Sequence, residues 1–92
     1  MSKRIYIYKD VIDALLKAGQ DYIDGNIDAI TLQRIIRSAE GKIEAVEEND
    51  IRDFLINAEG EIENALYMIP SGQRHDVISG IASNLIRRFG IN

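Results

Sequence analysis

The chain has 92 residues, of which 46% are hydrophobic and 28% are charged, and its formal net charge is −4. This length suits one domain with a core of moderate depth, and the composition is that of a globular protein rather than a disordered one. Because cysteine is absent, disulfide frameworks, thiol nucleophiles and thiolate metal sites are excluded.

The first ten residues, MSKRIYIYKD, contain neither a long apolar region nor a small-residue cleavage site. A secretory signal peptide is therefore not expected. No run in the sequence reaches the roughly 18 apolar residues that a membrane span requires. The absence of cysteine fits a reducing compartment, so we expect a cytoplasmic protein with no membrane partner.

Apolar residues recur at helical spacing in four segments, and the first of these ends at Gly25 and Asn26, residues typical of a helix C-terminus. Its apolar positions are Val11, Ile12, Leu15, Leu16, Tyr22 and Ile23. Before it, the sequence Ile-Tyr-Ile-Tyr at residues 5–8 fits either a short extended arm within residues 1–8 or the first turn of the helix. The pattern alone does not distinguish the two.

A second helix is predicted to begin at Asp28, whose carboxylate can accept hydrogen bonds from the first backbone amides. Ile27 and Leu32 stand on either side of this cap at the positions of a hydrophobic staple. The core positions of this helix are Leu32, Ile35, Ile36, Ala39, Ile43 and Val46. We expect a turn at residues 48–50 to separate it from the third helix.

The third helix is predicted to stop before Pro70, because the residue preceding a proline is pushed out of helical geometry. Its core positions are Ile51, Phe54, Leu55, Ala58, Ile62, Ala65, Leu66 and Ile69. Ser71 can cap a fourth helix, which carries Arg87 and Arg88 near its negative dipole end and closes at Gly90. The core positions of the fourth helix are Val77, Ile78, Ile81, Ala82, Leu85, Ile86 and Phe89.

All the connections between these segments are short, which favours antiparallel neighbours. The sequence therefore predicts a single all-α domain over residues 1–92. Its expected architecture is a compact antiparallel four-helix bundle.

The charge is unevenly distributed, because residues 39–63 carry nine acidic side chains against Lys42 and Arg52. The acidic residues are Glu40, Glu44, Glu47, Glu48, Asp50, Asp53, Glu59, Glu61 and Glu63. A centre this acidic repels phosphate backbones and attracts basic proteins. The simpler alternative is that these carboxylates only form solvated helix faces.

A hexapeptide occurs almost identically twice in this acidic region, as AEGKIE from Ala39 and as AEGEIE from Ala58. Each copy places a glycine, Gly41 or Gly60, on the side of its helix opposite the core stripe, at a cost of about 1 kcal/mol relative to alanine. Two copies are too few for a repeat architecture. The repeat indicates either two facing helices with similar requirements or a coincidence.

The outward side of the third helix combines apolar, small and acidic residues at helical spacing. Its members are Ile56, Gly60, Glu63 and Tyr67. An aromatic side chain beside a glycine and carboxylates is typical of a protein-binding surface, since glycine allows close backbone approach. The alternatives are single exposed side chains, which are common, or a stripe covered by the N-terminal segment.

No motif for catalysis or metal binding stands out. His75, the only histidine, lies near Ser71 and Asp76, but serine and aspartate at a helix start are expected as caps and no oxyanion-hole signature accompanies them. The glutamates between residues 40 and 47 share a predicted helix flank, yet the Glu-x-x-His pairs of bundle di-metal sites are missing. A helix-turn-helix formed by the second and third helices is also not expected, because the third, its candidate recognition helix, is acidic and would be repelled by DNA. We therefore do not expect an enzyme, and we expect no cofactor, metal or nucleic-acid ligand.

The segment YMIPSGQRHDVISGIASNLIRRFG resembles part of the immunity proteins that neutralise nuclease colicins and pyocins. Residues at comparable places are Tyr67, Pro70, Ser71, Arg74, Asp76, Gly80 and Ile81. DIRDFL, residues 50–55, resembles the start of the acidic binding helix of that family. The first half is similar to helical immunity proteins of the colicin D and contact-dependent-inhibition type. The chain differs at Met68 and Ile69, where the nuclease-immunity family has tyrosine, and it lacks that family's long acidic loop before the proline.

The resemblance implies an all-helical inhibitor that binds a basic toxin domain through an acidic helix face with an aromatic anchor. The predicted partner-binding residues are Ile56, Gly60, Glu63 and Tyr67 on the outward stripe, with Glu40, Glu44 and Glu59 beside it. The alternative function is a structural or regulatory module that forms a homodimer through the same stripe.

Overall fold

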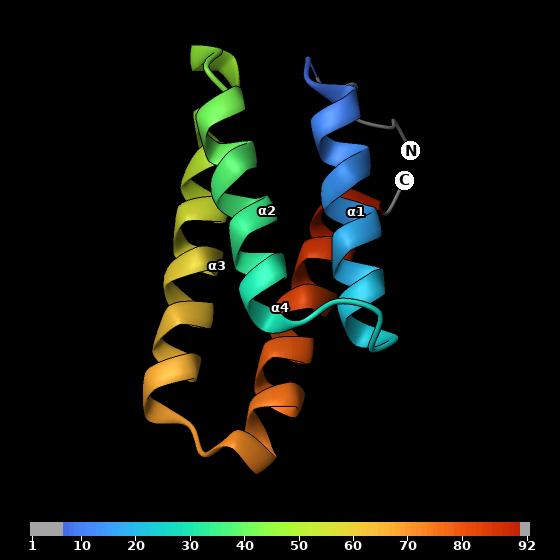
Figure 1. Ribbon diagram of the computed structural model, residues 1–92. Coiled ribbons are helices and arrows are strands. Elements are labelled where there is room, and N and C mark those ends of the chain that lie inside the picture. Colours follow the sequence, from blue (N-terminus) through green and yellow to red (C-terminus); the bar gives the residue numbers. More distant parts are fainter. Residues whose placement is uncertain (1–6, 91–92) are drawn as a thin grey trace.

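The computed structural model describes residues 7–90 and is an antiparallel four-helix bundle (Figure 1). Its helices are α1 (Lys9–Ile23), α2 (Ala29–Lys42), α3 (Asn49–Met68) and α4 (Ser71–Gly90), with a short 3₁₀ helix, η1 (Val46–Glu48), before α3. The described residues contain no strand, so the predicted all-α bundle is confirmed. Residues 1–6 of the predicted arm lie outside the described residues, while Ile7 and Tyr8 form a turn that leads into α1.

The four helices form a ring in which α1 packs most extensively on α4, and α2 packs on α3 (Figure 1). The contacts of α1 with α2 and of α3 with α4 are less extensive. In Figure 1 the turn between α3 and α4 projects beyond the nearby ends of α1 and α2. One end of the α3–α4 pair is therefore covered by fewer neighbours than the rest of the bundle.

The core is aliphatic and draws on all four helices. Its largest fully buried side chains are Ile12, Leu15, Leu32, Ile36, Ile43, Ile51, Leu55, Ile62, Ile78 and Leu85. Burying each side chain of this size stabilises the fold by roughly 1.5–3 kcal/mol. Helical spacing predicted every one of these positions.

The end of α1 and the start of α2 confirm the predicted caps. Gly25 has a φ of +81°, a conformation that favours glycine. Its amide donates to the carbonyl of Tyr22, and the amide of Asn26 donates to the carbonyl of Asp21, which is the hydrogen-bond pattern of a Schellman motif. At the start of α2, the Asp28 Oδ1 atom accepts a 2.8 Å hydrogen bond from the amide of Thr31.

The turn between α3 and α4 forms at Pro70, as predicted, but Ser71 has a different place from the one expected. Ser71 is the first residue of α4 rather than the residue before it, and the Pro70 carbonyl accepts a hydrogen bond from the amide of Gln73. The Nε atom of Arg74 donates to the carbonyl of Ile69 at 2.8 Å. This bond satisfies one of the last carbonyls at the end of α3.

The prediction that α2 continues to Val46 is wrong. The helix ends at Lys42, and Ile43 adopts an extended conformation that buries its side chain in the core. Residues 43–48 reverse the chain between two antiparallel helices, and this reversal turns Val46 outward, where it is 77% exposed. Val77, also predicted in the core, lies at the edge of α4 and is 41% exposed.

Candidate protein-binding surface

The four residues of the predicted outward stripe all lie exposed on one side of α3, here called the α3 outward face: Ile56, Gly60, Glu63 and Tyr67. Tyr67 is 84% exposed and Ile56 is 45% exposed. A Cβ atom added at Gly60 would meet no atom within 4 Å. No described part of the chain therefore covers this face at Gly60, and it can be approached by another molecule.

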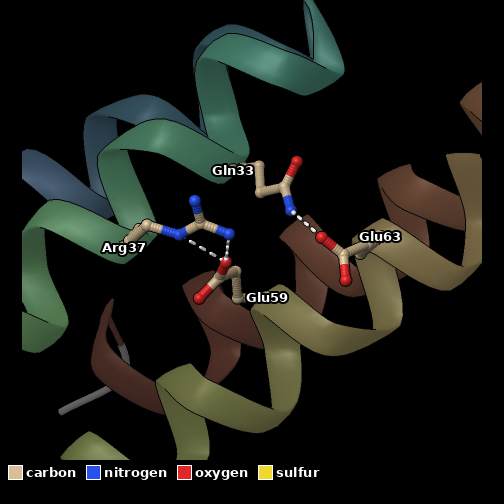
Figure 2. A network of polar contacts seen from close by, with 4 residues as sticks. All are labelled: Gln33, Arg37, Glu59 and Glu63. Atoms are coloured by element: carbon tan, nitrogen blue, oxygen red, sulfur yellow. Dashed lines mark hydrogen bonds and ion pairs between the residues drawn. The ribbon is translucent and has the colours of Figure 1, made fainter.

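Polar contacts between α2 and α3 border the α3 outward face (Figure 2). The Nε atom of Arg37 donates a 2.7 Å hydrogen bond to Glu59 Oε2, and Gln33 donates a longer one, 3.4 Å, to Glu63 Oε1. The Glu59 side chain is only 14% exposed. Glu59 is therefore engaged within the chain, whereas Glu63 remains exposed on the face.

Glu40 lies against Glu59 in this contact between the two helices. Its Oε2 atom is buried and has no hydrogen-bond partner among the described residues. Burial, together with the contact with Glu59, raises the pKa of Glu40 to about 7. Burial alone would also raise the pKa of Glu59, but its hydrogen bonds with Glu40 and Arg37 outweigh this effect and lower it. Two carboxyl groups so close avoid repulsion when one of them keeps its proton.

Glu44 lies apart from these residues, in the extended segment between α2 and η1, where it is exposed. The prediction that Glu40, Glu44 and Glu47 share one helix flank is therefore wrong. It assumed that α2 continued, but Glu44 follows the end of α2 and Glu47 belongs to η1. Of the three, only Glu40 belongs to the contact between α2 and α3.

Sequence spacing did not identify Glu48, the one charged residue that is fully buried among those described. Its Oε2 atom accepts a 3.0 Å hydrogen bond from the amide of Ile7, next to the start of α1. This bond connects the α2–α3 turn to the opposite side of the bundle. Helical periodicity cannot reveal such a residue, because Glu48 lies in a turn and its partner is 41 residues away.

A second open feature is a groove of about 910 Å³ between α3 and α4. The exposed side chain of Met68 lines it on α3, and Val77 lines it on α4. Glu61 and Arg87 lie on opposite sides, so the groove has no dominant charge. The α3 outward face differs because its one charged member is a carboxylate, that of Glu63, which lies beside exposed apolar side chains.

The ring of His75 stacks on the buried ring of Tyr22, with centroids 5.1 Å apart, so the structure shows His75 in a packing contact. Among residues 7–90, no group of three or more histidine, cysteine or acidic side chains is arranged to hold a metal ion. In the same residues, no helix has the length and apolarity needed to cross a membrane.

Comparison with protein-family models, with curated proteins and with solved structures gives no significant match to this chain. The likeness to immunity proteins therefore rests on the short segments of sequence described above. The function has to be argued from the chemistry of the α3 outward face.

Proposed function

We propose that this chain is an immunity-type inhibitor that binds a basic protein through the α3 outward face. The partner class that fits best is a nuclease toxin domain. The observation that carries the proposal is the 84% exposure of Tyr67, on the same open face as Ile56 and Gly60. Tyrosine is enriched among the residues that dominate binding energy, because a rigid ring buries a large area at low entropic cost.

The charge of α3 favours a basic partner. Glu63 is exposed on the α3 outward face itself, Asp53 and Glu61 are exposed elsewhere on the helix, and Arg52 is its exposed basic side chain. Opposite charge accelerates encounter between proteins, while buried aromatic contacts determine how long the complex lasts. The geometry adds one restriction to this account: Glu59 already pairs with Arg37, so it contributes less charge than the sequence alone indicates.

Titration calorimetry against purified, catalytically inactive nuclease toxin domains tests the proposal. For a domain that binds, Tyr67→Ala should weaken affinity by roughly 30-fold, as expected for a central aromatic anchor. Glu63→Lys should weaken binding at low salt and less at moderate salt, because added ions screen exposed charges. Asp10→Lys is the matched control, since it makes the same charge change at an exposed position on α1.

Two results would count against the proposal. One is a complex whose affinity is indifferent to Tyr67→Ala, Glu63→Lys and salt. The other concerns the chain alone: a dimer in sedimentation that Tyr67→Glu dissociates would show that the face serves self-association, the alternative function. Glu59→Lys is a poor test, because it would also break the internal pair with Arg37.

A further inference from the structure

The two copies of the hexapeptide begin on the neighbouring helices α2 and α3. The contacts Gln33–Glu63 and Arg37–Glu59 set an antiparallel register, because four residues forward on α2 match four residues backward on α3. This register places Ala39 within one residue of the level of Ala58, and both are buried. From this level the two copies run in opposite directions. Small residues at this level let the helices approach closely, and the next residue in each copy is a glutamate.

The two copies are related by a local pseudo-two-fold axis, but their surroundings are not equivalent. Three residues before Glu40 stands Arg37, which binds Glu59. Three residues before Glu59 stands Ile56, which has no charge to offer Glu40. The pair of carboxyl groups therefore has one arginine in direct contact, and that arginine is used by Glu59.

We propose that Glu40 and Glu59 share a proton and form a pH-dependent latch between α2 and α3. The latch is closed while Glu40 carries the proton, because a protonated carboxyl group can donate to Glu59. The buried Oε2 atom of Glu40 has no other partner among residues 7–90. When both groups are ionised, two acceptors face each other without a donor, and the contact between the helices weakens.

The surrounding charges are consistent with this assignment. Arg37 on α2 and Arg52 on α3 both favour the ionised form of Glu40, while Glu59 opposes it, and Glu63 acts on Arg37. On the side of α2 that packs against α1, Asp10 and Lys42 line a small recess. Burial of Glu40 and its contact with Glu59 outweigh the two arginines.

The direction of the pH effect follows from the shift. The pKa of Glu40 is raised from its ordinary 4.5 to about 7 in the folded chain. Its contribution to stability is therefore complete below about pH 4.5 and is lost as the pH rises through 7. The pKa of Glu59 is lowered, so its contribution is lost only as the pH falls below its ordinary value. The latch should therefore open as the pH rises through 7 and Glu40 loses its proton.

Urea unfolding between pH 5.5 and 8.5 tests the latch without any partner. The urea midpoint of the wild-type chain should fall as the pH rises through 7, whereas that of Glu40→Gln should change less, because glutamine donates to Glu59 at every pH. Glu44→Gln, an exposed glutamate with the same loss of charge, should keep the wild-type dependence. Every other ionisable group is common to the wild-type chain and the Glu40→Gln chain, so a difference between their two curves reports Glu40.

Carbon-13 NMR of the glutamate carboxyl groups gives a second readout that does not depend on the stability of a variant. In the wild-type chain, one carboxyl group assigned to Glu40 should titrate near neutral pH. Titration of Glu40 at its ordinary value would overturn the proposal. So would a Glu40→Gln chain that keeps the full wild-type pH dependence.

Discussion

At the level of single residues, Glu40 and Glu59 show how the same local sequence produces different chemistry. Both follow a buried alanine and precede an exposed glycine. Arg37 contacts Glu59 and holds it ionised, while the half-buried Glu40 is left against a carboxylate, with one of its oxygen atoms buried. This difference arises from the register between two helices, and that register cannot be read from either copy of the hexapeptide alone.

Removing the charge of Arg37 should destabilise the chain. In Arg37→Met the partly buried Glu59 loses its charged hydrogen-bond donor, so the free energy of unfolding should fall at neutral pH. Urea unfolding measures this directly. Lys9→Met is the matched control: it breaks an ion pair between two well-exposed side chains, and such a pair contributes little to stability. Equal effects of the two substitutions would contradict the role given to Arg37.

The cap of α2 provides a prediction with its own pH dependence. Asp28→Ala should lower the free energy of unfolding, because the amide of Thr31 loses its acceptor. The hydrogen bond with Thr31 lowers the pKa of Asp28, so the contribution of the cap is present above the ordinary value of 3.8 and is lost as the pH falls below it. Asp28→Asn should retain most of the stability in thermal unfolding and lose this acid dependence.

At the level of helices, alanine substitutions at two glycines distinguish the exposed surface of α3 from the packed contact between α1 and α4. A Cβ at Gly60 meets no atom within 4 Å, so Gly60→Ala should stabilise α3 by about 1 kcal/mol. At Gly19, between α1 and α4, a Cβ would lie 3.3 Å from the Ala82 carbonyl oxygen, so Gly19→Ala should raise stability less or lower it. Thermal unfolding of the two variants compares them. A destabilising Gly60→Ala would mean that the α3 outward face is covered.

Helical spacing and caps predicted most of the architecture, and the exceptions have physical causes. The Asp28 cap, the glycine at the end of α1 and the stop at Pro70 depend on neighbours a few residues away, so the sequence shows them. The end of α2 depends on where the chain must reverse to pack against α3, and the burial of Glu48 depends on a contact with Ile7. Such features are set by tertiary packing rather than by local pattern.

The candidate site was predictable to a similar extent. The stripe of Ile56, Gly60, Glu63 and Tyr67 follows from spacing alone, since residues at these intervals share one side of a helix. Spacing could not show that Arg37 pairs with Glu59 or that one carboxyl oxygen of Glu40 is buried, because both facts depend on the neighbouring helix. The partner remains a proposal, supported by exposure and charge.

At the level of the whole molecule, several surfaces of the bundle are open, and the proposed function assigns binding to one of them. The bundle offers the α3 outward face, the groove between α3 and α4, and the exposed side of α1. Aromatic and acidic residues occur together only on the first of these, within the described residues. The turn between α3 and α4 projects from the bundle (Figure 1). Tyr67 stands one residue before the end of α3 and is 84% exposed, so a partner can reach it.

The most direct test is an NMR titration of the isotope-labelled chain with an unlabelled, inactive nuclease toxin domain that binds it. The account predicts that the largest changes in backbone amide signals fall at residues 56, 60, 63 and 67, while those of Lys9 and Asp13 on α1 stay in place. Changes concentrated at Met68, Val77 and Arg87 would instead identify the α3–α4 groove as the binding surface and would contradict the account.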